Sequence, residues 1–106
     1  MKVGIALNRA DKLLENLERY EEKSYQKLEK ILKPVYNEIE DAVKRKFPEV
    51  RLLFDTNEMN IKVYNVDKRR DFVSVYDDIY LIVDNIISDK TTRIDFSLTI
   101  LGRETV

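Results

Sequence analysis

The stretch VRLLFDTNEMNIKVYN, residues 50–65, decides the fold, because it has the pattern of a β-hairpin. Apolar residues alternate with other residues over 50–55 and again over 60–65, which is typical of two strands that each bury one face. The polar run Thr56-Asn57-Glu58 between them supplies a turn. We therefore expect two antiparallel strands here, with one face of the sheet packed on a core.

Upstream of the hairpin, residues 9–47 carry apolar side chains at spacings of three and four, the period of an amphipathic helix. The members of this stripe are Leu13, Leu17, Tyr20, Leu28, Ile31, Val35, Ile39 and Ala42. Pro48 ends the run, because the residue before a proline avoids the helical conformation. The periodicity predicts one long helix over 9–47.

The polar side of this predicted helix carries acid–base pairs four residues apart, among them Glu29–Lys33 and Glu40–Lys44. Such pairs stabilise an exposed helix face by about 0.2–0.5 kcal/mol each. We therefore expect this side of the helix to be covered by local ion pairs.

Pro34 lies inside the predicted helix, where it removes one backbone hydrogen bond and clashes with the preceding turn. It must kink the helix or split it into two. The apolar stripe keeps its phase through Pro34, which favours a kink.

The first residues, 2–7, alternate Val3, Ile5 and Leu7 with other side chains, and Asn8 after them is a good N-cap. This pattern favours a short strand at Lys2–Leu7, with the frayed start of a helix as the alternative.

Downstream of the hairpin, residues 71–88 show a second helical stripe, preceded by a charged connection at 67–70. Residues 93–100 then alternate strictly between apolar and polar side chains, which is typical of an antiparallel strand with one exposed face.

These elements predict a single α+β domain over residues 1–106, with a small antiparallel sheet covered by helices on one face. The expected order is β-α-β-β-α-β, the order of the ferredoxin-like fold, with a long Pro-kinked first helix. If 2–7 is not a strand, the order becomes α-β-β-α-β. Neither order specifies a function.

Composition excludes several kinds of chemistry. The chain has no Cys and no His, so disulfides, Cys/His zinc sites and histidine-based catalysis are excluded. For a carboxylate-based magnesium nuclease, the nearest match to an acid-x-Lys pattern is Asn60-Ile61-Lys62, which lacks the acid. We expect no cofactor, no metal and no enzymatic activity.

The net charge and the length of the apolar runs limit the kinds of partner that the sequence predicts. The net charge of −1 gives no general attraction to nucleic acid. No apolar run reaches the about 20 residues of a membrane span, and no secretory leader is visible, which predicts a cytoplasmic protein without a membrane partner.

The long helix motivates the first functional hypothesis, a small interaction module. A sheet of short strands cannot cover so long an apolar stripe, and an uncovered stripe implies a partner. We expect a homodimer formed through helix 9–47. The residues expected to mediate it are Leu13, Leu17, Tyr20, Leu28 and Ile31.

The alternative hypothesis is nucleic-acid or anion binding by the basic loop Lys68-Arg69-Arg70, which precedes the second helix. Cations beside the free N–H groups of a helix start can hold a phosphate. Residues of the open sheet face expected to take part are Lys62, Tyr64 and Arg93. The opposing interpretation is a solvated loop whose positive charge is balanced by Asp67 and Asp71.

Overall fold

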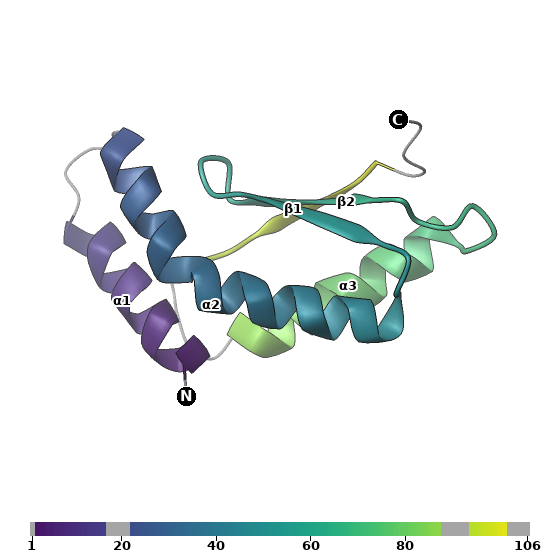
Figure 1. Cartoon of the computed structure of the whole chain (residues 1–106), viewed down its shortest axis with the longest axis horizontal. Coiled ribbons are helices and arrows are strands. Elements are labelled where there is room, and N and C mark those ends of the chain that lie inside the picture. The colour runs from purple at the N-terminus through teal and green to yellow at the C-terminus, as the bar shows by residue number, and fades with distance from the viewer. Residues whose placement is uncertain (1, 17–21, 88–93, 102–106) are drawn as a thin grey trace.

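The computed structural model describes residues 2–16, 22–87 and 94–101. These residues form an α+β fold in the order α-α-β-β-α-β (Figure 1). The elements are α1 (Lys2–Asn16), α2 (Glu22–Lys46), β1 (Arg51–Asp55), β2 (Asn60–Tyr64), α3 (Phe72–Ile87) and β3 (Ser97–Ile100). The predicted hairpin and the predicted helix 71–88 are thus confirmed.

The three strands form one mixed sheet in the order β1-β2-β3. β1 and β2 pair antiparallel, with Leu52 opposite Val63, and β2 and β3 pair parallel, with Ile61 opposite Leu98. α3 carries the chain from the end of β2 back to the start of β3, as a parallel connection requires.

The antiparallel pairing predicted for the last strand is therefore wrong, and the ferredoxin-like order is not found. The alternation of Ile94, Phe96 and Leu98 identified correctly which side chains are buried. Alternation is the same in both strand directions, however, so it could not predict the parallel pairing.

α2 and α3 cover one face of the sheet, and no described helix covers the other face (Figure 1). The inward side chains of the central strand, Ile61 and Val63, are completely buried between the strands and the helices. From α2, Leu32, Ile39 and Val43 fill the same core.

α1 packs beside the N-terminal part of α2, so the two helices form an antiparallel hairpin (Figure 1). The single helix predicted over 9–47 is wrong, because the chain forms two helices on either side of residues 17–21, which lie outside the described residues. α2 continues as one helix through Pro34, which rules out a break there, whereas the kink stays a prediction.

The strand predicted at Lys2–Leu7 is also wrong, since these residues belong to α1. The buried face of α1 is Val3, Ala6, Leu7 and Ala10, at helical spacings. Its two alanines are small enough to bring α1 close to α2, but an alternation count based on large apolar residues overlooks them.

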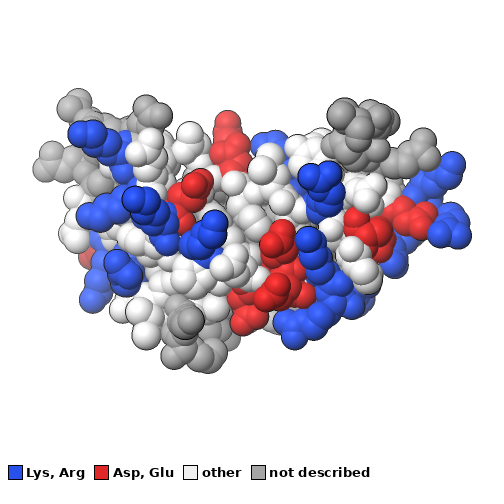
Figure 2. All heavy atoms as spheres, viewed as in Figure 1, with Lys and Arg blue, Asp and Glu red and all other residues white. Residues whose placement is uncertain are grey.

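Charged side chains of both signs cover much of the face shown in Figure 2. Within the described residues, no helix has both the length and the apolar character needed to cross a membrane.

Candidate functional site

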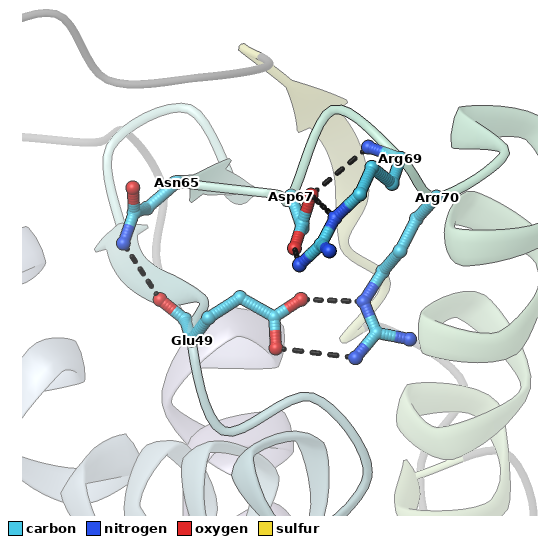
Figure 3. A network of polar contacts seen from close by, with 5 residues as sticks. All are labelled: Glu49, Asn65, Asp67, Arg69 and Arg70. Carbon is cyan, nitrogen blue, oxygen red and sulfur yellow. Dashed lines mark hydrogen bonds and ion pairs between the residues drawn. The ribbon is translucent and has the colours of Figure 1, made fainter.

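The predicted basic loop, Lys68–Arg70, lies between β2 and α3 in a network of polar contacts (Figure 3). The Arg69 guanidinium donates to both carboxylate oxygens of Asp67, with Nη2–Oδ2 at 2.8 Å and Nε–Oδ1 at 3.2 Å. The backbone N–H of Arg69 donates to the same carboxylate at 2.9 Å. These hydrogen bonds hold the pKa of Asp67 well below its usual range and raise the pKa of Arg69.

Arg70 is bound in the same way to Glu49, which precedes β1 (Figure 3). Its Nε and Nη2 donate to the two carboxylate oxygens, the second at 3.2 Å, and its guanidinium carbon lies 4.8 Å from the ring centroid of Phe47. The hydrogen bonds from Arg70 lower the pKa of Glu49. Asn65, with φ of 63°, donates its side-chain N–H to the Glu49 carbonyl at 2.9 Å and completes the network.

The start of α3 is occupied by its own cap. The Asp71 carboxylate accepts hydrogen bonds from the Ser74 hydroxyl at 2.9 Å and from the Val73 backbone N–H at 3.3 Å. A phosphate at this end would have to compete with Asp71, and to reach Arg69 or Arg70 it would have to displace Asp67 or Glu49. The arrangement favours a structural role for the loop arginines.

The other residues of the predicted nucleic-acid surface are not gathered at one place. Lys62 and Tyr64 project from β2 on the open sheet face, where Lys62 Nζ lies 3.3 Å from the Asp55 carboxylate. Beside them, the Asn60 amide donates to the Ser97 hydroxyl at 2.8 Å. Arg93 lies outside the described residues.

No metal site is evident on these elements. In the parts of the chain that the structure describes, no three acidic side chains converge as metal ligands would.

The described residues among those predicted to mediate self-association are buried or partly buried. Leu28 is 2% exposed, and Leu13 and Ile31 pack against the core, because α1 folds back on α2. Leu17 and Tyr20 lie outside the described residues. The apolar stripe that seemed to need a partner is therefore largely covered by the chain itself.

The basic residues of the two N-terminal helices differ from those of the loop. Six exposed cations project from the α1–α2 hairpin, and none has a carboxylate partner among the described residues. We call this surface the basic hairpin face. It consists of Arg9 and Lys12 from α1 and Lys23, Lys27, Lys30 and Lys33 from α2.

The contrast with the rest of the chain is sharp. From residue 44 onward, six of the eight described cations form ion pairs, and Arg51 and Lys68 are the two exceptions. The paired cations are Lys44, Arg45, Lys46, Lys62, Arg69 and Arg70. Among the described residues, cations without an ion pair are thus concentrated on the helical hairpin, and Figure 2 shows basic side chains over that end of the molecule.

Helix geometry brings the free cations together. Lys23, Lys27 and Lys30 are spaced by four and three residues, so they share one face of α2. Arg9 of α1 lines the same shallow depression as Lys30 and Pro34, so Arg9 lies near Lys30 of α2. From Lys23 to Lys33 the row extends about 15 Å along the helix.

The sequence offered little signal for this surface, because Glu29 was expected to pair with Lys33. Glu29 instead accepts a hydrogen bond, at 3.5 Å, from the Thr56 hydroxyl in the β1–β2 turn. By contrast, the predicted pair Glu40–Lys44 is found at 3.9 Å.

No protein-family model, curated protein or solved structure matches the chain. The functional interpretation therefore depends on the geometry and charge of the described residues.

Proposed function

We propose that the protein binds nucleic acid through the basic hairpin face, by contacts to the phosphate backbone of a duplex. The observation that carries the proposal is the set of six exposed cations on two adjacent helices, none paired with a described carboxylate.

Unpaired cations are the ones available to a phosphate. A lysine already bound to a carboxylate must give up that partner before it can bind a ligand. A free lysine displaces condensed counterions from the nucleic acid, and their release drives binding. This difference favours the hairpin over the loop at Arg69 and Arg70, whose side chains are held by Asp67 and Glu49.

The kind of side chain favours backbone contacts over recognition of bases. Five of the six cations are lysines, which act as mobile point charges and lack the planar fork with which arginine reads guanine. Along the axis of a duplex, a row of about 15 Å spans about four base-pair steps of 3.4 Å each. We therefore expect binding with little sequence preference.

The same surface favours a double strand over a single strand. Proteins that hold single strands stack the bases on exposed aromatic rings. Within the described part of the hairpin, the aromatic residues are Tyr25, which is half-buried, and Tyr36, which is buried. The described residues of this face thus offer positive charge without a fully exposed aromatic ring.

The net charge of −1 is compatible with a local binding face. Residues 1–34 contain eight basic and six acidic residues, and residues 35–106 contain eleven and fourteen. The chain is therefore positive at the hairpin end and negative elsewhere, which would orient the protein toward a polyanion.

The test compares two triple variants that remove the same charge. Lys27/Lys30/Lys33→Gln alters the basic hairpin face, and Lys68/Arg69/Arg70→Gln alters the loop. Fluorescence anisotropy with a labelled duplex is recorded over a range of salt concentrations, after circular dichroism has shown that both variants are folded. The logarithm of the binding constant falls linearly with the logarithm of the salt concentration, and each lost phosphate contact makes this slope shallower by about 0.9. The slope of the hairpin variant should therefore be shallower by about 3, and that of the loop variant should change much less.

Three results would overturn the proposal. One is no binding of the wild-type protein even at low salt. Another is an equal or larger loss in the loop variant, which would return the site to Lys68–Arg70. The third is binding to anionic lipid vesicles without binding to the duplex, which would make the ligand a membrane surface.

A further inference from the structure

β1 lies at the edge of the sheet, and the order β1-β2-β3 leaves its outer side without a described strand. Its inward side chains, Leu52 and Phe54, stay partly exposed. The residues opposite them on β2, Val63 and Ile61, are completely buried. The difference indicates that the outer side of β1 is open.

The backbone groups on this outer side have no partner in the described sheet. The residue after β3 donates its N–H to the Val63 carbonyl at 2.9 Å, so Val63 directs its backbone groups toward β3. Successive residues of a strand direct these groups to opposite sides, so those of Lys62 point toward Leu53 of β1. By the same alternation, the N–H and C=O of Leu52 and Phe54 point away from the sheet. A row of such groups is a template for another strand.

β1 also lacks the features that protect many edge strands from pairing with another chain. It contains neither Pro nor Lys, and its pairing with β2 runs over five consecutive residues without a bulge. Leu53, at its centre, lies opposite Lys62 on the open sheet face and is 51% exposed. A regular, uncovered edge with an exposed leucine is a site for a further strand.

We infer that a second copy of this chain pairs with this edge, so that the two β1 strands lie antiparallel about a two-fold axis at Leu53. In this register Leu53 faces Leu53 of the second copy, and Leu52 faces Phe54 of the second copy. The outward N–H and C=O groups of Leu52 and Phe54 then bond to one another across the axis, as in a regular antiparallel ladder. The exposed parts of these two inward side chains are buried at the same time.

The charges of β1 select this register. Arg51 and Asp55 lie at the two ends of the strand, on the same face as Leu53, and Arg51 faces Asp55 of the second copy. Arg51 is exposed and forms no ion pair with a described carboxylate. Moving the axis by one residue in either direction would still pair outward backbone groups, but it would separate Arg51 from Asp55 of the second copy.

Asp55 can bind Arg51 of the second copy without losing its present contacts. One of its oxygens lies 3.3 Å from Lys62 Nζ, and the other accepts the Glu58 backbone N–H at 3.2 Å. An ionised carboxylate offers about four acceptor sites. Lys62 reaches Asp55 from β2, whereas Arg51 of the second copy reaches it from the outer side of β1. The carboxylate therefore lies between two cations, and no like charges meet at the axis.

Other occupants of the edge fit less well. Parallel pairing of two β1 strands would place the two Arg51 side chains beside each other and likewise the two Asp55 side chains, which is destabilising. A strand of a different protein would need an acid and a base at the spacing that β1 already provides. The inference does not depend on nucleic-acid binding, because the basic hairpin face lies on α1 and α2.

The first experiment measures mass by sedimentation equilibrium over the micromolar range. The wild-type chain of 12.6 kDa should approach twice that mass as its concentration rises. Arg51→Glu should raise the dissociation constant by about tenfold or more, because each dimer exchanges two opposite-charge pairs for two like-charge pairs. Lys68→Glu is the matched control: it makes the same charge change at another exposed cation without a described ion pair, so this variant should dimerise as the wild type does.

The second experiment identifies the partner by mixing two variants, after circular dichroism has shown that both are folded. Asp55→Arg alone should also weaken self-association, because it brings two arginines together at each end of the paired strands. A mixture of Arg51→Glu with Asp55→Arg should form a heterodimer at concentrations where each variant alone is monomeric, since both pairs in the mixed dimer have opposite charges.

The third experiment tests the register with a disulfide, since the chain contains no Cys. Residues that face each other across the axis have Cα atoms about 4.5 Å apart, which a disulfide can span. Leu53→Cys should therefore form a covalent dimer rapidly on mild oxidation. Val73→Cys, at a position of α3 that is 68% exposed, should do so much more slowly.

Four results would each overturn the inference. The first is a wild-type protein that stays monomeric, and the second is a dimer that Arg51→Glu leaves unchanged. The third is a mixture of the two folded charge variants that forms no heterodimer. The fourth is a Leu53→Cys chain that forms the disulfide no faster than Val73→Cys.

Discussion

Removing either hydroxyl of the Tyr36–Thr56 pair is expected to destabilise the protein, and removing both is expected to cost less than the two single changes together. The two oxygens lie 2.6 Å apart, and the residues are only 6% and 3% exposed. Their hydrogen bond joins α2 to the β1–β2 turn, where the Tyr36 ring also stacks on Phe54 at 4.3 Å between centroids. The bond therefore lies in a dry part of the core.

The magnitude follows from what each substitution leaves behind. Thr56→Val leaves the Tyr36 hydroxyl buried without its partner. Tyr36→Phe leaves the Thr56 hydroxyl with only the Glu29 carboxylate at 3.5 Å, which is longer than a normal hydrogen bond. A buried group that loses its partner costs about 1–3 kcal/mol, whereas replacing both partners by apolar groups is nearly neutral. The coupling free energy should thus favour the double variant by about 1–3 kcal/mol.

The assay is urea unfolding of the wild type, both single variants and Tyr36→Phe/Thr56→Val, followed by circular dichroism. The dependence of the unfolding free energy on urea concentration should be the same in all four proteins, so that differences between their urea midpoints report differences in stability. A second readout uses pH, because burial raises the pKa of Tyr36 to about 12. Since the unfolded tyrosine titrates near 10, the stability contributed by neutral Tyr36 is complete below about pH 10 and is lost as the pH rises toward 12. Two results would refute this reasoning. One is a double variant whose loss of unfolding free energy equals the sum of the two single losses. The other is a loss of stability at alkaline pH that is the same in Tyr36→Phe as in the wild type.

Two further predictions concern the core and the loop network. Ile39→Ala should lower the free energy of unfolding by about 2–5 kcal/mol, because Ile39 is completely buried, and urea unfolding with Ile39→Val as a milder control checks it. Asp67 and Glu49 have lowered pKa values, so their ion pairs stabilise the fold above the unfolded pKa of about 4 and lose this effect as the pH falls further. In Arg69/Arg70→Gln, the free energy of unfolding should therefore fall less steeply below about pH 4 than in the wild type. The same pH dependence in both proteins below about pH 4 would count against this role.

The parts of the fold that the sequence predicted well are those set by local periodicity. The hairpin around Thr56 and the helix Phe72–Ile87 each repeat a single period over their full length, and the structure has both. The helix predicted over 9–47 failed because its stripe keeps the same phase on both sides of residues 17–21. In an antiparallel hairpin the two halves of such a stripe face each other, so periodicity cannot distinguish one long helix from two packed ones.

The prediction of one long helix over 9–47 also led to the first functional hypothesis, self-association through that helix. The stripe seemed too long for a small sheet to cover, and the surplus was assigned to a partner. In the structure, Leu7 and Ala10 of α1 are buried in the same core cluster as Leu28 and Leu32 of α2. The two helices thus cover much of this stripe within the chain. Large exposed apolar side chains among the described residues occur on α1, β1 and α3, for example Ile5, Leu53 and Val73.

For the basic hairpin face too, the sequence alone could not predict the contacts between distant residues on which the interpretation depends. A sequence shows where cations are clustered, but a cation is available to a ligand only if no carboxylate holds it, and that choice depends on contacts between distant residues. Arg70 is held by Glu49, 21 residues earlier, and the Glu29 carboxylate lies 3.5 Å from the Thr56 hydroxyl, 27 residues later, without an ion pair to its neighbour Lys33. Two of the three cations in the basic run Lys68-Arg69-Arg70 are therefore held by carboxylates, whereas Lys23, Lys27, Lys30 and Lys33 of α2 form no ion pair with a described carboxylate. Charge density along a chain and free charge on its surface are different quantities, and only the second determines where a polyanion can bind.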